Sequence, residues 1–466
     1  MRAGSTSTPP SAKGRPRLTV TRTASPQATA SPQATTWAAP SLASSRAATV
    51  GLTALLLLTA GTPSCQSIRA SAIPEAPTWA NHPSHDISLI YRRAIVAPSR
   101  RQGEPYERSR PALDPNRARL FVGSSDNGLY ALRAQDGRTL WRFETLAPVQ
   151  SEPVYDAEED AVYFGSHDGA LYKVRAVDGE LLWRFATNAE VTRPPILSGS
   201  RVYFVNANDT VIAADRATGK RLWSRHQTPA YGMEVVGHSG LLLAHGRLYV
   251  AFSDGTVTAF DPEDGSERWV PVDLSAEAEQ ALGQVPEYLD VDTTPVAASI
   301  NGTQAVLVGS YAAGVYALHA ETGNQLWTNP AVRGVTDVKL WEQPPHTDAR
   351  GQRFPERRIV IASTGTTGLW GLDPETGEEL WRRDAPAEGV HAPAFIAGAM
   401  LVTTTNRGIF LLSPLDGAVI DGIHTGLGFA APVASFGHRA FALSNGGDLL
   451  ALGVNGPKKP SRASAQ

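Results

Sequence analysis

The chain has 466 residues, a formal net charge of −3 and 42% hydrophobic residues, which is enough apolar material for a large core. The charge is uneven, because residues 1–46 hold six basic and no acidic residues, leaving 36 basic against 45 acidic residues beyond. An acidic body argues against nucleic acid as a partner. A single cysteine excludes a disulfide framework, so folding must rely on the core.

The first 64 residues are predicted to be a disordered leader followed by a signal peptide. Residues 1–46 are rich in Ser, Thr, Ala and Pro without apolar periodicity, a composition typical of disorder. The apolar run at 47–61 is short for a membrane-spanning helix and has the length of a signal h-region. A linker at 65–86 and a polar tail at 457–466 are expected on either side of the repeat region.

The sole cysteine, Cys65, follows the apolar run by four residues. Its position resembles the lipidated cysteine of bacterial lipoproteins, which implies cleavage before Cys65 and a lipid anchor at the outer membrane. Ser64 suits this cleavage, whereas Thr62 and Pro63 depart from the usual Leu and small residue. Two alternatives stay open: cleavage after Ala70–Ala72, which gives a soluble periplasmic or secreted chain, and an uncleaved anchor.

A repeated unit fills residues 87–456. Units such as LYALRAQDGRTLWRF recur about every 40 to 58 residues, with a tryptophan four residues after a turn glycine in the pairs Gly137/Trp141, Gly179/Trp183, Gly219/Trp223, Gly265/Trp269, Gly323/Trp327 and Gly377/Trp381. This period is typical of a propeller or solenoid. Asp-Gly between apolar runs predicts tight hairpins, and four short strands per unit predict a propeller blade.

Eight apolar runs are interpreted as the third strands of eight blades: Leu129–Leu132, Leu171–Val174, Val211–Ala214, Val257–Phe260, Val315–Leu318, Leu369–Leu372, Ile409–Leu412 and Leu449–Leu452. The last has no outer strand after it, and an open edge would be unpaired. Ile87–Val96 is available to supply that strand. The expected fold is an all-β, eight-bladed propeller of four-stranded antiparallel blades closed by the N-terminal strand, with seven blades as the alternative.

The repeat tryptophans are interpreted as structural, each on an outer strand and docked into the neighbouring blade. Asp421 stands where the seventh unit should carry its tryptophan, so weaker packing is expected there. The acidic clusters at 156–160 and 261–265 fall in expected turns and are predicted to be solvated. Insertions at 275–295 and 341–358 are of a length that more often serves function than spacing.

The unit [LV]-Y-A-L-x-x-x-[DT]-G-x-x-L-W resembles the quinoprotein-type (PQQ-like) propeller repeat over about residues 87–456. Two classes of protein carry this repeat, namely quinone-dependent dehydrogenases and non-enzymatic propellers of the outer-membrane assembly lipoprotein family BamB. The segment LDVDTTPV at Leu289–Val296 is very similar to the DVDTTPV of the BamB family, after a similar inserted loop.

That resemblance implies that Asp290 and Asp292 contact the β-barrel insertase BamA. It also implies contacts from Met233 and Val235, which stand at two leucine positions of a nearby loop, although Val236 stands where that loop has arginine. Alternation puts both aspartates on one face. The other interpretation of the pair is a solvated cap on the turn before a strand.

The sequence favours a binding propeller over an enzyme. The alcohol-dehydrogenase branch of the quinoproteins stacks its quinone against a disulfide between adjacent cysteines, which one cysteine excludes; the sugar-dehydrogenase branch needs no such disulfide. No calcium loop, P-loop, G-x-S-x-G or H-E-x-x-H motif is present. The expectation is a non-enzymatic periplasmic scaffold without cofactor or metal, a monomer within a larger complex. The alternatives are an exported propeller for an unknown envelope ligand and a quinoprotein dehydrogenase.

Overall fold

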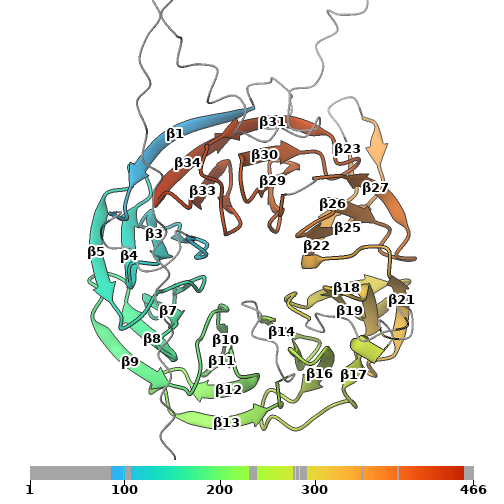
Figure 1. Ribbon diagram of the computed structural model, residues 1–466, viewed down its shortest axis with the longest axis horizontal. Coiled ribbons are helices and arrows are strands. Elements are labelled where there is room, and N and C mark those ends of the chain that lie inside the picture. Colours follow the sequence, from blue (N-terminus) through green and yellow to red (C-terminus); the bar gives the residue numbers. More distant parts are fainter. Residues whose placement is uncertain are drawn as a thin grey trace, which may run out of the picture. The chain divides into compact units, whose positions relative to one another are not determined.

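The computed structural model shows a closed ring of eight four-stranded antiparallel sheets around a central axis (Figure 1). It describes residues 86–97, 99, 106–229, 239–276, 279, 283, 291–347, 351–385 and 388–455, which all belong to the compact unit that begins at Ala72. The prediction of an all-β, eight-bladed propeller is confirmed, and the seven-bladed alternative is wrong. None of the described residues forms a helix with the length and apolar character needed to span a membrane.

Each blade is written here from its inner strand to its outer strand. The first four blades are β2 (Ala112–Asp114), β3 (Arg119–Gly123), β4 (Gly128–Arg133), β5 (Thr139–Glu144); β6 (Val154–Asp156), β7 (Ala161–Ser166), β8 (Ala170–Arg175), β9 (Leu181–Ala186); β10 (Ile196–Ser198), β11 (Arg201–Asn206), β12 (Thr210–Asp215), β13 (Arg221–His226); β14 (Leu241–Ala244), β15 (Arg247–Ala251), β16 (Thr256–Phe260), β17 (Val272–Asp273).

The last four blades are β18 (Val296–Ile300), β19 (Thr303–Ser310), β20 (Gly314–His319), β21 (Gln325–Asn329); β22 (Val335–Gln343), β25 (Arg357–Thr364), β26 (Leu369–Leu372), β27 (Glu379–Arg383); β28 (Ala394–Ile396), β29 (Ala399–Thr403), β30 (Gly408–Leu412), β31 (Val419–His424); β32 (Ala434–Phe436), β33 (Arg439–Leu443), β34 (Asp448–Val454), β1 (Ile87–Ala94). A small hairpin, β23 (His346–Thr347) and β24 (Arg353–Phe354), projects from the sixth blade between β22 and β25. All eight third-strand runs foreseen from the sequence lie in third strands.

The turn glycines are required by both backbone and neighbours. Gly179 has a φ of +77°, and an added Cβ would lie 2.7 Å from the ring of Trp141 in the preceding blade. Only glycine adopts this left-handed conformation readily, and only glycine leaves room for the indole. The repeat therefore couples two residues in different blades, the tryptophan of one and the glycine of the next.

A β-bulge immediately before the aromatic residue turns it toward that glycine. In the first blade Ala131 pairs with Trp141 and Leu132 with Thr139, which leaves Leu140 unpaired and exposed. A bulge bends the strand and re-aims the following side chain. The same register shift recurs in five further blades, where the unpaired residues are Leu182, Leu222, Leu326, Leu380 and Ile420.

The tryptophans bond to the next blade at one repeated place, the carbonyl three residues before its turn glycine. The indole N–H of Trp141, Trp183, Trp223, Trp327 and Trp381 donates to the carbonyls of Ala176, Arg216, Pro262, Pro374 and Pro414, at 2.9–3.1 Å. Trp269 differs: the equivalent carbonyl, that of Ala320, accepts from the Tyr249 hydroxyl at 2.8 Å. The buried N–H of Trp269 has no hydrogen-bond partner among the described residues.

Trp269 also lies outside any strand, so the expectation that every repeat tryptophan sits on an outer strand is wrong for the fourth blade. Pro271 follows it by two residues and has no N–H to give to the sheet. The outer strand β17 forms only beyond this proline and pairs over two residues, Val272 and Asp273.

The core is divided among the joints between blades. Eight clusters of buried apolar side chains each join the facing sheets of two neighbouring blades. One of them joins the last blade to the first through Phe441 and Leu449 on one side and Leu120 and Val122 on the other. The ring is therefore packed at every joint, including the one where the chain closes.

The N-terminal strand β1 closes the ring by pairing with β34 from Ile87↔Val454 to Ala94↔Asp448. It reproduces the features of the other outer strands, with an unpaired Ile90 at a bulge and Tyr91 after it. The Tyr91 hydroxyl donates to the carbonyl of Ala134 at 3.0 Å, and its ring lies against Gly137. Tyr91 thus does at the eighth joint what tryptophan does elsewhere.

Asp421 has a specific role at the seventh joint. It is buried at 4% exposure, and its carboxylate accepts a hydrogen bond from the backbone N–H of Ile87 at 2.7 Å. The eighth blade has no turn glycine before its outer strand, because that strand comes from the other end of the chain. At this joint the Asp421 carboxylate, which accepts from the first N–H of β1, replaces the tryptophan side chain used at other joints.

Candidate functional site

The strand order gives the ring two distinct faces. In each antiparallel blade, the connection from inner to second strand and the glycine turn leave at one face, here called the turn face. The connection from second to third strand and the connection to the next blade leave at the other, here called the channel face. The connection from β17 to β18, which carries the DVDTTP motif, begins and ends on the channel face, whereas the hairpin β23–β24 stands on the turn face.

The described part of the DVDTTP motif is held firmly on the channel face. Val291 and Thr293 are buried, and Asp292 between them is half-buried. The Thr293 hydroxyl accepts from the N–H of Gly309 at 2.8 Å and donates to its carbonyl at 3.0 Å. Arg193 donates to the Asp292 carbonyl at 2.9 Å, which ties the segment to the third blade.

The Thr293 contact is one instance of a clamp that recurs around the ring. Ser151 makes the same pair of hydrogen bonds with Gly165, at 2.8 and 2.9 Å, and Ser109 accepts from the N–H of Gly123 at 2.9 Å. Each clamp precedes a proline by two residues and fixes the connection that enters a blade. Asp292 therefore sits beside a structural element, in a backbone that is already ordered.

The remaining sequence-predicted residues lie outside the described residues. These are Asp290, Met233, Val235 and Cys65. The expected alignment of Asp290 with Asp292 on one face stays a prediction.

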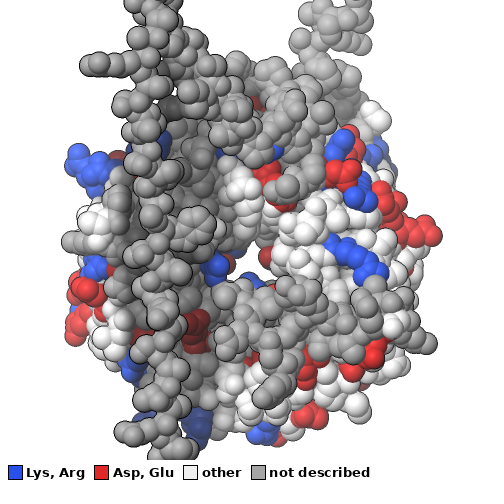
Figure 2. All heavy atoms as spheres, in the orientation of Figure 1, with Lys and Arg blue, Asp and Glu red and all other residues white. Residues whose placement is uncertain are grey.

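A cavity of about 330 Å³ at the centre of the ring is lined by residues of seven blades, from six of the connections that enter blades, from the inner strand β22 and from the turn between β7 and β8. No described residue of the fourth blade lines it. Charged residues contribute to the wall, and Figure 2 shows Lys or Arg side chains beside Asp or Glu side chains at the rim of the central opening. The charged and titratable wall residues are Arg108, Arg110, Glu152, His167, Arg193, Asp337, Lys339 and His391.

Two ion pairs and two neutral histidines organise that wall. Arg110 meets Glu152 at 3.1 Å, and Lys339 meets Asp337 at 3.5 Å. Burial lowers the pKa of His167, against the opposing effect of Glu190. Burial also lowers the pKa of His391, whose Nε2–H donates to the Phe429 carbonyl at 2.9 Å. Burial therefore favours the neutral form of both imidazoles.

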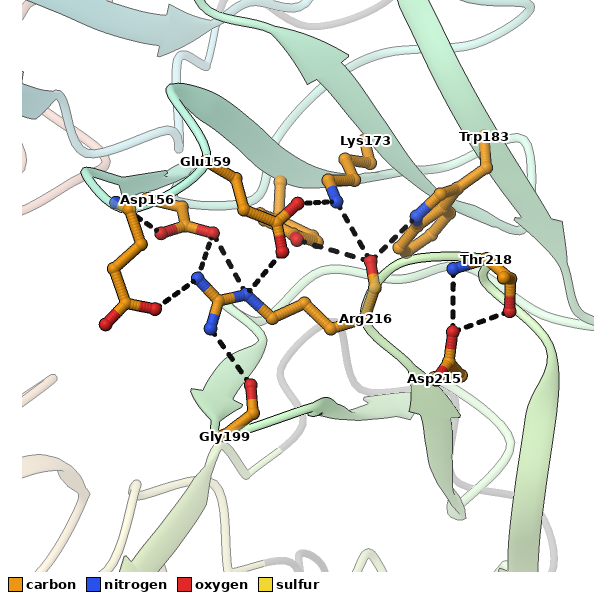
Figure 3. Close-up of polar contacts among 10 residues, drawn as sticks. Asp156, Glu159, Lys173, Trp183, Gly199, Asp215, Arg216 and Thr218 are labelled. Atoms are coloured by element: carbon orange, nitrogen blue, oxygen red, sulfur yellow. Dashed lines mark hydrogen bonds and ion pairs between the residues drawn. The ribbon is translucent and has the colours of Figure 1, made fainter.

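The acidic cluster at 156–160 is solvated only in part: Glu158 and Glu159 are exposed, as predicted, whereas a cation from the third blade reaches the buried Asp156 (Figure 3). Asp156 is buried and accepts from Nε of Arg216 at 3.0 Å. Glu159 pairs with Lys173, whose ammonium also donates to the Arg216 carbonyl at 2.9 Å. That carbonyl is the one that accepts the indole N–H of Trp183. The network ties two blades together on the turn face.

The second acidic cluster, at 261–265, is only partly solvated. Asp261 pairs with Arg268, and Glu263 pairs with Arg201 of the preceding blade at 2.6 Å. Asp264 is exposed, as predicted. No group of three or more His, Cys, Asp or Glu side chains in the described part of the chain is arranged to hold a metal ion.

Sequence reasoning missed the channel wall and Tyr91. A signal for the wall was present, since Ser109-Arg110-Pro111, Ser151-Glu152-Pro153, Thr293-Thr294-Pro295 and His391-Ala392-Pro393 share one pattern before the inner strands. The middle residue of each faces the cavity. Tyr91 had no such signal, because its unit lacks the turn glycine that marks the others.

Eight four-stranded blades joined by aromatic side chains over turn glycines define the class of PQQ-like β-propellers. A family model described as outer membrane protein assembly factor BamB matches residues 125–341 and 335–456. The chain belongs to this BamB family. The expected resemblance is thus confirmed at the level of the family.

Curated relatives are similar at low identity. BamB of Burkholderia pseudomallei (strain K96243) is 23% identical over 329 residues, covering 54% of this chain and 81% of that protein. BamB of Legionella pneumophila (strain Paris) is 23% identical over 207 residues, covering 44% of this chain. The chain spans 48% of the Legionella protein's length.

Solved structures share the fold across most of the ring. The crystal structure of BamB from Moraxella catarrhalis has a TM-score of 0.61 at 16% identity, and the match covers 79% of this chain and 99% of that chain. A quinohemoprotein alcohol dehydrogenase from Pseudomonas putida HK5 has a TM-score of 0.58 at 14% identity, covering 82% and 78%. At these identities the likeness concerns the fold alone. The fold is shared with both classes of protein that carry the repeat, namely BamB propellers and quinone-dependent dehydrogenases.

Proposed function

We propose that this chain is a non-enzymatic periplasmic scaffold that assists the assembly of outer-membrane β-barrel proteins by binding a BamA-like insertase. The family match over residues 125–456 carries the proposal. The DVDTTPV motif supports it, because its described part lies on the channel face in an ordered backbone. A fold by itself does not define function, so the motif and the family bear the argument.

The contact is proposed to be electrostatic. The carboxylates of Asp290 and Asp292 suit a basic patch on the partner, and charge complementarity governs both the rate of encounter and specificity. Met233 and Val235 would add apolar contact beside them. The ordered backbone around Thr293 lowers the entropy that binding must overcome.

Binding of the purified full chain to a purified BamA-like insertase tests the site. Asp290→Asn with Asp292→Asn should keep the melting temperature and weaken binding by about 2–5 kcal/mol, because it leaves partner charges unmatched. Met233→Ala with Val235→Ala should weaken it further. Glu378→Gln with Glu379→Gln, on exposed turn-face residues, is the matched control. Wild-type affinity in the stable aspartate variant would refute this contact site.

We further propose that Cys65 carries the lipid that holds the scaffold at the outer membrane. Its solitary place after the apolar run supports this. The intact mass of protein extracted from membranes should match a chain beginning at Cys65 plus acyl groups, and Cys65→Ala should be released to the soluble periplasm. A wild-type chain that begins at Ile73 without lipid would contradict the anchor.

A further inference from the structure

The entry to the fourth blade departs from the clamp that holds the entries of other blades. The pairing of β14 with β15 follows the register of β6 with β7, so Ser239 occupies the position of the clamp residue Ser151. The second strand of the fourth blade, however, carries Ala251 where the clamped strands carry a glycine such as Gly165. A break in an otherwise consistent pattern is expected at functional sites.

Ser239 bonds to the DVDTTP motif. It is buried, and its hydroxyl donates to the carbonyls of Thr293 and Gly240, both at 2.9 Å. The hydroxyl of Thr293 is already clamped to Gly309 in the fifth blade. The same motif residue is therefore held from the fourth blade through its carbonyl and from the fifth blade through its side chain.

Gly240 leaves the space that the next motif residue occupies. An added Cβ would lie 2.3 Å from Oγ1 and 3.1 Å from Cγ2 of Thr294. Threonine has two heavy branches on its Cβ, so no rotamer of Thr294 clears both positions. Its backbone would have to move, and this movement is resisted because Pro295 has a fixed φ and Thr293 is clamped. Alanine at position 240 would therefore push on the motif two residues from Asp292.

We propose that Ser239 and Gly240 are positioning residues, which hold the DVDTTP motif in the arrangement that the insertase contact requires. The inference rests on the proposed function for the identity of the partner. Arg193 donates to the Asp292 carbonyl from the third blade, so the motif backbone is held from three blades at consecutive residues. A motif that is ordered before binding lowers the entropy that binding must overcome.

Binding of the full chain to a purified BamA-like insertase, with the melting temperature of each variant, tests Ser239. Ser239→Ala should weaken binding about threefold to tenfold, which corresponds to one hydrogen bond. Ser151→Ala is the matched control, because it removes the equivalent clamp in the second blade. The control should lower the melting temperature at least as much and keep wild-type affinity.

Gly240→Ala should weaken binding at least as much as Ser239→Ala. Gly389→Ala is its control, since an added Cβ on this connection into the seventh blade would lie 2.9 Å from Cγ2 of Thr405, and it should bind like wild type. Thr294→Ala added to Gly240→Ala removes both clashing branches and should recover part of the affinity. Two independent defects would instead add.

Hydrogen exchange needs no partner and separates this proposal from the proposed function. The N–H groups of residues 291–294 should exchange faster in Ser239→Ala and in Gly240→Ala, and at the wild-type rate in the two controls. If the folded wild type does not bind the insertase, the proposed function fails, and exchange then decides whether Ser239 and Gly240 position the motif.

Loss of affinity confined to the Ser239 and Gly240 variants, with faster exchange at 291–294, supports the proposal. Wild-type affinity in both variants, in a chain whose aspartate variant loses binding, overturns it. Equal losses of affinity in these variants and in their controls, or unchanged exchange at 291–294, also overturn it. The role of Gly240 is refuted if Thr294→Ala recovers no affinity in the Gly240→Ala chain.

Discussion

Tyr91 completes the set of aromatic side chains that join the blades. Its hydroxyl reaches the carbonyl three residues before Gly137, the same place that an indole N–H reaches at five other joints. Aromatic rings bury a large area and still satisfy one polar group. A tyrosine in place of tryptophan makes the closing joint dependent on the protonation state of a phenol.

Tyr91→Phe is expected to destabilise the fold by about 0.5–1.5 kcal/mol at neutral pH, the usual net value of one hydrogen bond. Burial raises the pKa of Tyr91 to about 12 from 10.0, with a smaller contribution from Asp136. A raised folded-state pKa gives stability that is complete below pH 10 and is lost as the pH rises toward 12. The variant should therefore lose less stability than wild type over that range.

Denaturant unfolding at a series of pH values measures this difference. Tyr106→Phe, on an exposed tyrosine, is the control and should follow wild type. Tyr130 and Tyr172, whose pKa burial also raises to about 12, should preserve part of the alkaline dependence. Identical curves for Tyr91→Phe and wild type up to pH 12 would contradict the assignment.

At the scale of the element, β1 is the strand on which ring closure depends. It pairs along its length with β34, and its first N–H is received by Asp421 of the neighbouring blade. At the same end of the pairing, the N–H of Asn455 donates to the carbonyl of Asp86 at 2.9 Å. The seventh joint therefore uses a hydrogen bond to a strand terminus where the repeat elsewhere uses a ring over glycine.

Asp421→Ala should destabilise the chain by about 1–3 kcal/mol, because it leaves the buried N–H of Ile87 without its acceptor. Asp421→Asn keeps an acceptor oxygen and should cost less. Asp416→Asn, on an exposed turn aspartate that caps Ala418, is the control. Hydrogen exchange should quicken in β1 first, since β1 loses its anchor. If the free energy of unfolding of Asp421→Ala lies within about 0.5 kcal/mol of the wild-type value, as is typical of surface changes, Asp421 does not anchor β1.

The local sequence pattern predicted most strands correctly. It failed where the structure depends on contacts between residues far apart in the chain. The alternating runs and Asp-Gly turns predicted the strands, and the missing outer strand after Leu452 predicted β1, which ends at Ala94, two residues short of the expected Val96. The repeat predicted a full outer strand in the fourth blade, but Pro271 has no N–H to give to the sheet, so β17 is short. The buried state of Asp156 depends on Arg216, 60 residues further on, which no local pattern reports.

The candidate site was predictable only in part for the same reason. The DVDTTPV motif is continuous in sequence, so it could be found by resemblance. The channel wall is assembled from six blade-entering connections, the strand β22 and the turn between β7 and β8, which are far apart in the chain, and the residue type at each wall position varies. Periodicity located these connections without revealing that their charges converge on one cavity.

At the scale of the whole molecule, the two faces of the ring differ in the features that they carry. The turn face carries the Arg216 network, which joins two blades through the buried Arg216–Asp156 ion pair and the hydrogen bond from Lys173 to the Arg216 carbonyl. The channel face carries the described part of the DVDTTP motif and connections that line the central cavity. A partner that binds the motif would approach the channel face and leave the turn face exposed.

Site-specific photo-crosslinking in intact membranes tests this account most directly. A photoreactive residue at position 292, on the channel face, is compared with one at position 378, on the turn face. The account predicts a crosslink from position 292 to a BamA-like insertase and none from position 378. Folded, membrane-associated protein that gives no insertase crosslink from position 292, or equal crosslinks from both positions, would contradict it.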